Sequence, residues 1–358
     1  MSPVDWRELY ASNRAVIERA GGTPADLPTA LGASPHTHPL LGQARAGQPG
    51  AWDERTTTVA GRTRRALVHT PASIEPETAV PLVCMLHGCT QDAASFAAAT
   101  LMNEAADRHG VIAVYPQQER GENPQGCWNW FEPQHQARGA GEPASIAGVV
   151  RELIGTTSPW TVDPRRVFMA GLSAGGAMAA ILAATYPDLF AAVAVHSGLA
   201  YGSATSVSAA FTVMARGGGD PAGRGRAAHA AMGDLARPVP SIVVHGSADQ
   251  TVAPVNGDQV LEQSMTANRL AAPETCEFDI TRPTATSRGR VDGGHPYTHS
   301  RWTDRRGALM HELLRVEGLR HAWSGGAPGG SYTDPRGPDA TEAIWRFFAQ
   351  VTADAPTG

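Results

Sequence analysis

The most restrictive feature of this sequence is a serine between two glycines, where a strand changes into a helix. Residues 167–187 read VFMAGLSAGGAMAAILAATYP: an apolar run, the serine motif and an alanine-rich segment. The apolar run predicts a buried strand, and the alanine-rich segment predicts a helix. Gly171 and Gly175 permit the tight turn that holds the hydroxyl of Ser173 out of the sheet. We therefore expect Ser173 to be a nucleophile, although an ordinary turn with a capping serine is the simpler alternative.

Short apolar runs alternate with helix-like segments over most of the chain. This alternation predicts an α/β fold with a mostly parallel, doubly wound sheet that helices cover on both faces. The sequence around Gly61 predicts a hairpin at one sheet edge, and residues 308–318 favour a final strand over a helix. The expected strands lie within 79–88, 110–116, 165–171, 190–198 and 240–246, and the expected helices are 93–109, 144–156, 174–186, 226–236, 256–271 and 340–351.

The first 50 residues differ in composition from the remainder. Residues 4–20 have the pattern of an amphipathic helix, and a segment rich in glycine and proline follows it. We expect residues 1–50 to form an N-terminal extension or arm and residues 51–358 to form one catalytic domain. The arm could wrap the body, contact a partner or form a mobile tail.

Charge and hydropathy exclude several classes of partner. The 29 basic and 34 acidic residues give a net charge of −5, which provides no field to attract nucleic acid or an anionic membrane. We find no apolar run of the roughly 18 residues that a membrane span needs. The N-terminus lacks the basic and apolar pattern of a signal peptide, so the sequence by itself indicates the cytoplasm. It does not indicate an oligomeric state.

A nucleophilic serine needs a base, and the base needs a carboxylate that orients it. In this type of strand–turn–helix arrangement, the acid and then the histidine follow the serine along the chain. Asp249 comes just after the expected strand at 240–246, at the sheet edge where α/β proteins place their sites. His321 follows the last expected strand and is our candidate base, with His299 as the next candidate.

The negative charge that develops on the reacting oxygen needs two hydrogen-bond donors. The amide of Ala174, directly after the serine, supplies one of them. The other should come from the loop after residues 83–88, VCMLHG, at either Cys89 or Thr90.

Five segments in order resemble the polyhydroxybutyrate depolymerase family of α/β-hydrolase esterases, whose relatives include feruloyl and acetylxylan-type esterases. They are LHGCTQ, CWNWF, GLSAGGAMA, HGSADQTV and GLRHAWSGG, within residues 52–350. The resemblance implies a triad of Ser173, Asp249 and His321, with the Cys89 amide as an oxyanion donor. It also implies a disulfide between Cys89 and Cys127. Because disulfides belong to oxidising compartments, the resemblance points to possible secretion, against the N-terminal sequence.

The reaction expected of these residues is ester hydrolysis through an acyl-enzyme, without a metal or an organic cofactor. The substrate would be a short-chain ester, foremost a hydroxyalkanoate polyester. Aromatic side chains near the expected site are candidates for the substrate pocket because apolar walls suit such esters. These candidates are Trp128, Trp130, Tyr297, Trp302 and Trp323.

Three other functions remain open at this point. A feruloyl or acetylxylan-type esterase would use the same chemistry on plant polysaccharide, and a peptidase would use it on an amide. A protein that binds without catalysis is an alternative of another class, and the complete serine, aspartate and histidine set argues against it.

Overall fold

The computed structural model describes residues 50–59, 61–75, 78–156 and 160–353. Ten strands form one sheet in the order β1-β2-β4-β3-β5-β6-β7-β10-β9-β8. They are β1 (Ala51–Val59), β2 (Arg62–Thr70), β3 (Ala79–Leu86), β4 (Ile112–Pro116), β5 (Thr161–Leu172), β6 (Ala192–His196), β7 (Ser241–Gly246), β8 (Ala285–Arg290), β9 (Pro296–Thr303) and β10 (Leu309–Val316). A second sheet pairs β11 (Trp323–Ser324) with β12 (Thr333–Asp334).

The centre of the large sheet is parallel and its two ends are antiparallel. Neighbouring strands from β4 through β3, β5, β6 and β7 to β10 all run in the same direction. Strands β1 and β2 form the expected hairpin at one end, and β10, β9 and β8 are antiparallel at the other. The expected α/β fold is confirmed, and so is the final strand at residues 308–318, which is β10. The apolar runs of the sequence form the central strands, as expected for a sheet that is covered on both faces.

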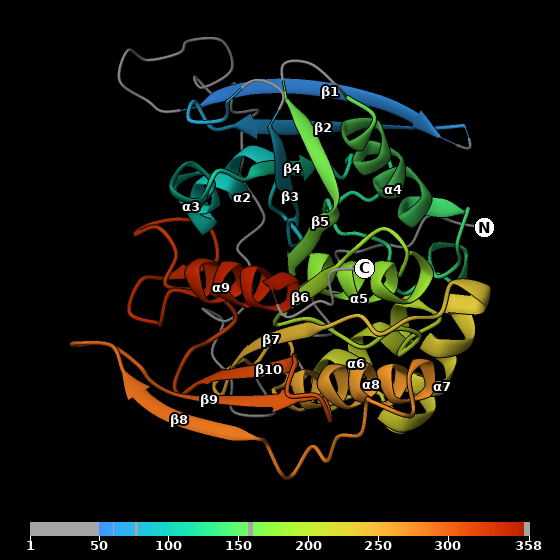
Figure 1. The fold of residues 1–358 in the computed structure, drawn as a ribbon, viewed down its shortest axis with the longest axis vertical. Helices are drawn as coiled ribbons and strands as arrows, with labels where there is room; N and C mark the ends of the chain where they lie inside the picture. Colours follow the sequence, from blue (N-terminus) through green and yellow to red (C-terminus); the bar gives the residue numbers. More distant parts are fainter. Residues whose placement is uncertain (1–49, 60, 76–77, 157–159, 354–358) are drawn as a thin grey trace.

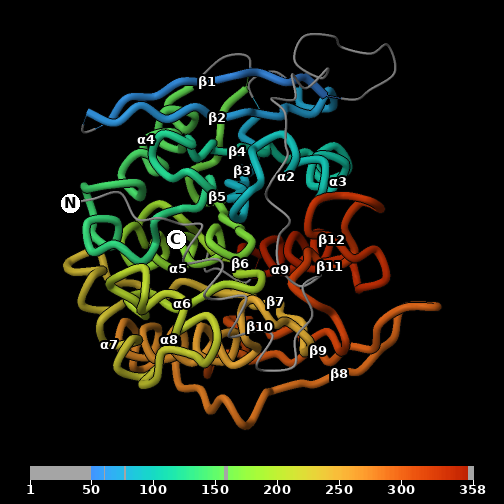
Figure 2. The backbone as a smooth tube through the Cα atoms, turned by 180° about the vertical axis from the view of Figure 1, so that it is seen from behind, coloured from blue at the N-terminus to red at the C-terminus, as the bar shows by residue number. Residues whose placement is uncertain are grey.

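Helices cover both faces of this sheet (Figure 1). On one face lie α2 (Ala93–Thr100), α3 (Met102–His109) and α9 (Ala340–Ala353). The other face carries α4 (Gly141–Ile154), α5 (Ala174–Thr185), α6 (Val207–Arg216), α7 (Pro221–Met232) and α8 (Val255–Ala271). The 3-10 turns η2 (Pro133–His135) and η3 (Gly233–Leu235) complete the elements. Figure 2 shows the same layers from behind.

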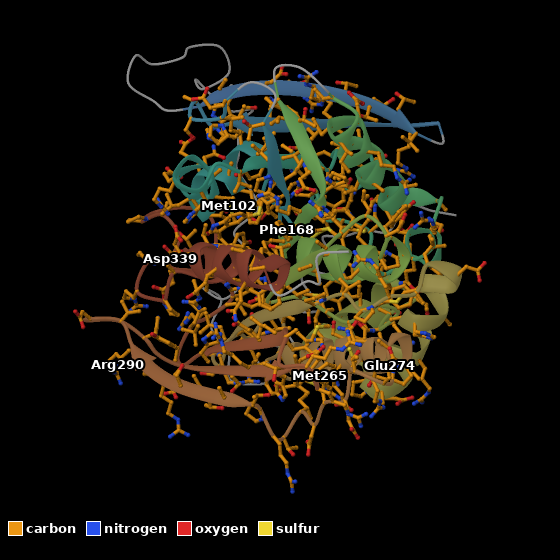
Figure 3. The ribbon with its side chains drawn as sticks, viewed as in Figure 1. Met102, Phe168, Met265, Glu274, Arg290 and Asp339 are labelled. Atoms are coloured by element: carbon orange, nitrogen blue, oxygen red, sulfur yellow. A yellow bond between two sulfur atoms is a disulfide. The ribbon has the colours of Figure 1, made fainter. Side chains whose placement is uncertain are left out.

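Each face of the sheet has its own hydrophobic core. On the α9 face, Phe168 of β5 stacks on Phe348 with ring centroids 4.6 Å apart. Figure 3 shows Phe168 in the middle of the molecule, Met265 on α8 and Arg290 at the periphery on β8. Burial of large apolar side chains on both faces fixes the central strands, and the carboxyl ends of those strands provide a rigid edge for a site.

Three local features differ from the pattern expected from sequence. The helix expected at residues 93–109 is two helices, because Leu101 adopts a left-handed conformation with φ of 56° between them. Helix α7 begins at Pro221, five residues earlier than expected. Asp220 caps its N-terminus, because the Asp220 side chain accepts a hydrogen bond from the backbone amide of Gly223. Helix α6 and strands β8 and β9 were not expected.

The helix expected at residues 4–20 lies outside the described residues, as does the proposed extension apart from Gly50. Among the helices within the described ranges, none combines the length and apolar character required to cross a membrane.

Candidate active site

Ser173 lies at the junction of β5 and α5, in a backbone conformation with φ of 58° and ψ of −120°. Non-glycine residues rarely adopt positive φ, and those that do cluster at functional sites. The flanking glycines allow close backbone contacts at this turn. An ideal Cβ on Gly175 would lie 2.0 Å from the carbonyl oxygen of Leu86, and one on Gly171 would lie 2.3 Å from the carbonyl carbon of Gly175. The G-x-S-x-G sequence is therefore needed sterically at this junction.

Ser173 and His321 line one small cavity, of about 40 Å³. His321 reaches it from the loop between β10 and β11, as expected from the position of this residue after the last strand of the large sheet. The remaining lining residues are Gly88, Cys89, Gln91, Leu172, Met214, Thr251 and Tyr332. The cavity thus brings together segments that are far apart in the sequence.

Asp249 lies next to His321 and is almost fully buried. Its Oδ2 atom is 2.7 Å from Nδ1 of His321. Its Oδ1 atom accepts hydrogen bonds from the backbone amides of Thr251 at 3.0 Å and Val252 at 2.8 Å. These two amides hold the carboxylate in the loop after β7, with one oxygen directed at the imidazole. The structure therefore brings the three residues expected to form the triad to one place.

The charge state of Asp249 depends on several opposing effects. Burial raises the pKa of Asp249, but the charge of His321 and its hydrogen bond, His245 and the Val252 amide together leave the pKa below its ordinary value. The carboxylate is therefore ionised at neutral pH and accepts hydrogen bonds only. An ionised acceptor is the group that can fix the tautomer of His321.

Two further histidines, His196 and His245, are buried close to the Asp249–His321 pair. Burial, followed by the charges of His245 and His321, lowers the pKa of His196 to about 3. Burial likewise lowers the pKa of His245, whose Nε2 lies 2.9 Å from the carbonyl oxygen of Val252. Both rings are neutral at pH 7. No sequence motif marked either histidine as part of the site.

His299, the next candidate base, and two further histidines lie elsewhere. His299 is on β9, where Nε2 is 2.8 Å from Oε2 of buried Glu312. His295 pairs with Asp334, and His311 is buried beside Ser241. None of the three lines the cavity that contains Ser173. His321 is thus the candidate base that the geometry favours.

The structure distinguishes between Cys89 and Thr90 as the second oxyanion donor. The Thr90 amide donates to the carbonyl of Gln125 at 2.7 Å, and the Gly88 amide donates to Oε1 of Gln91 at 2.9 Å. Cys89 lines the cavity between these two engaged amides. Ala174 is the first residue of α5, where backbone amides are not used within the helix. Cys89 and Ala174 are thus well placed for the assignment made from the sequence.

The expected disulfide between Cys89 and Cys127 is confirmed, with an S–S distance of 2.07 Å. It links the candidate oxyanion loop to the loop that contains Trp128. The indole N–H of Trp128 donates to the carbonyl of His87 at 3.0 Å, and Arg64 lies over the indole ring at 5.0 Å. Trp128 therefore stabilises the candidate oxyanion loop through its hydrogen bond to the backbone of His87.

The five aromatic residues expected to bind substrate do not line the cavity. Trp128 and Trp130 are buried in the core, where Trp130 packs against Phe131. Trp302 is buried and donates to the carbonyl of Asp279. Trp323 stacks on His196 on the side away from solvent, and Tyr297 lies over Gly289 in the β8–β9 ladder. Proximity to strand ends in the sequence did not indicate which way these rings would point.

The side chains that do shape the cavity came from unexpected positions. Met214 is on α6, which the sequence did not predict, and Thr251 follows Asp249 in the sequence. Tyr332 comes from the glycine-rich region after His321. The only sequence signal for Thr251 was its distance of two residues from the acid, and we see none for Met214 or Tyr332.

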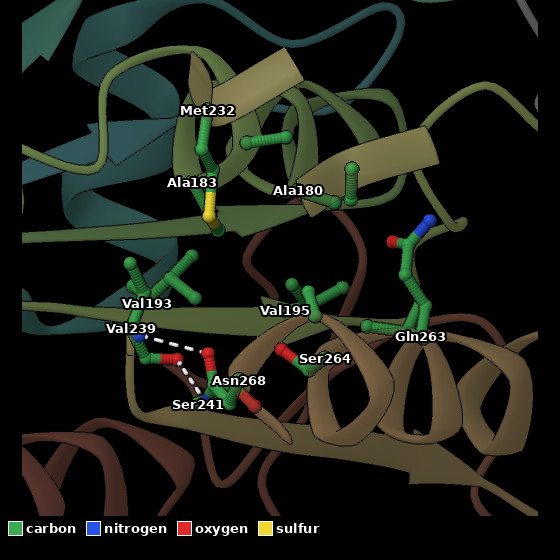
Figure 4. Close-up of a pocket in the computed structure, with 14 residues that line it drawn as sticks. Ala180, Ala183, Val193, Val195, Met232, Val239, Ser241, Gln263, Ser264 and Asn268 are labelled. Carbon is green, nitrogen blue, oxygen red and sulfur yellow. Dashed lines mark hydrogen bonds between the residues drawn. The ribbon is translucent and has the colours of Figure 1, made fainter. Parts of the chain in front are cut away.

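A second cavity, of about 30 Å³, lies between α5, α7 and α8 and contains none of the triad residues (Figure 4). Its walls are mostly apolar, with Val193, Val195 and Met232 among them. The side chain of Asn268 is occupied by hydrogen bonds with the backbone of Val239, drawn in Figure 4. Within the described ranges, no cluster of three potential ligands from histidine, cysteine, aspartate and glutamate is placed to hold a metal ion.

Comparisons of sequence connect this geometry with known proteins. A model of the family described as esterase PHB depolymerase matches residues 66–276. The chain is 43% identical over 262 residues to poly(3-hydroxyalkanoate) depolymerase C of Paucimonas lemoignei. This match covers 71% of this chain and 57% of that protein. It is 34% identical over 139 residues to feruloyl esterase B of Neurospora crassa, over 37% of this chain and 46% of that protein. The chain spans about half the length of these curated relatives.

Comparison of structures gives an acetyl xylan esterase from Aspergillus awamori, with a TM-score of 0.64 and 21% sequence identity. The match covers 84% of this chain and 99% of that protein. At this level of identity, the two chains share a fold.

Proposed function

This chain belongs to the esterase PHB depolymerase family and has the α/β-hydrolase fold, and from that premise we propose that it is a serine carboxylic-ester hydrolase. The proposed substrates are short-chain hydroxyalkanoate polyesters or related short-chain esters. The resemblance to this family noted in the sequence is thereby confirmed. The single observation that carries the proposed activity is the cavity that Ser173 shares with His321, whose Nδ1 is bound to Asp249.

The geometry supports a two-step reaction. With Nδ1–H of His321 donating to Asp249, Nε2 is unprotonated and can accept the proton of the Ser173 hydroxyl. The Oγ atom then attacks the ester carbonyl, and the amides of Cys89 and Ala174 stabilise the negative oxygen of the tetrahedral intermediate. His321 returns its proton to the departing alcohol. A water molecule, activated by the same imidazole, then releases the acid from the acyl-enzyme.

The size of the cavity supports a small substrate group. Its volume of about 40 Å³ is far below the roughly 150 Å³ of a cavity known to enclose a benzene ring. A methyl or short hydroxyacyl group suits this space, whereas a feruloyl ring would have to remain outside it. This favours the hydroxyalkanoate proposal over a feruloyl substrate. An acetyl esterase remains the second candidate, because an acetyl group is also small and a named acetyl xylan esterase shares the fold.

A substrate panel tests the proposal. We expect release of 3-hydroxybutyrate from short oligomers and from polymer film, and turnover of p-nitrophenyl butyrate. Release of acetate from acetylated xylan that equals or exceeds the release of 3-hydroxybutyrate would favour the acetyl esterase. Rapid release of ferulate from methyl ferulate would contradict the preference for small groups that we infer from the cavity volume. If none of these esters is hydrolysed, the catalytic proposal fails and a binding function is the alternative.

The disulfide supports an oxidising compartment as the place where the protein works. A bond between Cys89 and Cys127 persists outside the reducing cytosol. We therefore propose an extracytoplasmic location, which fractionation of the producing cells followed by detection of the chain would test.

A further inference from the structure

We propose that Tyr332 determines specificity for the alcohol part of the ester. This inference rests on the proposed esterase function and assigns one wall of the cavity to one half of the substrate. Nothing in the sequence motifs marks this residue, which follows His321 by eleven positions in a glycine-rich region.

The ring of Tyr332 lies against the candidate base. Tyr332 lines the cavity together with Ser173 and His321. The rings of Tyr332 and His321 are arranged edge to face, with centroids 6.2 Å apart. A bulky aromatic wall therefore lies directly beside the imidazole that handles the proton.

Hydrogen bonds connect the Tyr332 segment to the candidate oxyanion loop. The phenol oxygen of Tyr332 lies 3.3 Å from Oγ1 of Thr90. The preceding carbonyl, that of Ser331, accepts a hydrogen bond from Nε2 of Gln91 at 2.9 Å. Gln91 also accepts from the amide of Gly88, so one side chain joins the two loops. These bonds fix the ring in place and make it a wall rather than a mobile surface group.

The backbone of Tyr332 is held in an unfavourable conformation. Its φ is 52°, a left-handed value that costs energy for a residue with a large side chain. The amide of Trp323 donates to its carbonyl at 2.6 Å, which helps to hold this conformation. Glycine or asparagine would adopt the same φ more easily. A tyrosine kept there under strain, facing an active site, indicates that its ring has a use.

The direction of proton transfer identifies which half of the ester meets Tyr332. His321 must donate its proton to the oxygen of the departing alcohol, so that oxygen lies within hydrogen-bond reach of the imidazole. Side chains packed against His321 are then the neighbours of the alcohol. In a polyester this alcohol is the next unit of the chain. Tyr332 would therefore limit the bulk of that unit at the cleavage point.

Two series of esters test this assignment separately. The first varies the alcohol, comparing cyclohexyl butyrate with methyl butyrate. The second keeps p-nitrophenol as the alcohol and varies the acyl chain, comparing hexanoate with acetate. Tyr332→Asn removes the ring and suits a left-handed backbone. Tyr332→Phe keeps the ring and removes the contact with Thr90.

We expect Tyr332→Asn to raise the cyclohexyl-to-methyl ratio of kcat/KM by about tenfold or more, as for other pockets in which a steric wall is removed. The hexanoate-to-acetate ratio should stay within about twofold of the wild-type ratio. Tyr332→Phe should retain the wild-type alcohol ratio, because it keeps the ring. If Tyr332→Asn does not fold, Tyr332→Gly, which adopts positive φ readily, replaces it.

An unchanged alcohol ratio in the folded ring-deletion variant would overturn the assignment, and so would a change confined to the acyl series. Circular dichroism spectra and the fraction of molecules labelled by a phosphonate at Ser173 establish that the variant is folded. Failure of the proposed esterase function can be distinguished from failure of this assignment, because the wild-type protein would then hydrolyse neither series of esters.

Discussion

The Oδ2 atom of Asp249 lies 2.7 Å from Nδ1 of His321, and this contact sets the chemistry of the site. An ionised carboxylate accepts hydrogen bonds only, so the Nδ1 atom of neutral His321 carries the hydrogen. Nε2 is then the basic nitrogen. The same carboxylate stabilises the imidazolium that forms when His321 takes the serine proton.

Replacing Asp249 with asparagine should lower kcat by about 10³- to 10⁴-fold, because the amide can favour the wrong tautomer of His321. The effect on KM should be small, since Asp249 does not line the cavity. Steady-state kinetics with p-nitrophenyl butyrate measure both quantities. A variant that folds normally and keeps kcat within tenfold of wild type would contradict the assigned role of Asp249.

His245 should also affect turnover, as a positioning residue that acts through Asp249. Its Nε2 lies 2.9 Å from the carbonyl of Val252 and 3.6 Å from Oδ2 of Asp249, so it braces the loop that holds the carboxylate. We expect His245→Ala to lower kcat by about tenfold, with KM nearly unchanged, as when a supporting residue no longer holds a catalytic group in place.

His311 offers a matched control for this prediction. It is equally buried on the neighbouring strand β10, where it contacts Ser241 and Asn268. His311→Ala should reduce stability without lowering the kcat of the folded fraction. Equal losses of kcat in the two variants would show that His245 has only a structural role. A shift of the acid limb of the pH profile of kcat that occurs in His245→Ala and not in His311→Ala would support the positioning role of His245.

The fold was predictable to the extent that burial imposes a pattern on the sequence. Central strand β3 is apolar along its whole length, and β7 is buried along its whole length, because both faces of the sheet are covered. The polar strand β8 is exposed along most of its length and has no such pattern. The break between α2 and α3 at Leu101 was also not predictable from the sequence. The residues on either side of Leu101 form helices, and only the backbone conformation of Leu101 separates them.

The candidate triad was predictable because each member follows a strand and the chain order is fixed by the fold. The walls of the cavity were not. Trp323 lies two residues after His321, yet its ring stacks on buried His196, whereas Tyr332 faces the cavity. Side-chain direction in loops depends on tertiary contacts, and sequence periodicity does not report it there.

The disulfide should contribute to both stability and activity. Closing a loop with a sequence separation of 38 residues stabilises a folded chain by about 4 kcal/mol. Cys127→Ser should lower the free energy of unfolding by about this amount and lower kcat, because Cys89 would hold its amide less firmly. Urea denaturation and steady-state kinetics measure the two effects.

Thiol counting provides an independent check of the same bond. Cys84 and Cys276 are the free cysteines, so denatured protein should titrate two thiols before reduction and four after it. Four thiols before reduction, in protein prepared under oxidising conditions, would contradict the pairing.

Stability should fall steeply as the solution is acidified from neutral pH. Burial lowers the pKa of five histidines: that of His87 and His135 to about 4, that of His196 and His311 to about 3, and that of His245 below its ordinary value. Below the unfolded value of about 6.5, the unfolded chain binds protons that these folded histidines do not, so acid favours unfolding. Each such group adds up to about 1.4 kcal/mol per pH unit to the slope.

Urea denaturation at pH 7.5, 6.5 and 5.5 measures this dependence. His311→Gln should reduce the slope by up to about 1.4 kcal/mol per pH unit, because one of these groups is removed. A free energy of unfolding that stays constant between pH 6.5 and 5.5 would show that these histidines are protonated in the folded protein.

Labelling with a fluorophosphonate tests most directly whether Ser173 is an activated nucleophile. We predict one adduct per chain by intact mass, located at Ser173 by peptide mapping, with loss of turnover of p-nitrophenyl butyrate in proportion to labelling. Ser173→Ala should take up no adduct and show no turnover above background. Turnover that survives full labelling of Ser173, or that persists in Ser173→Ala, would contradict the account.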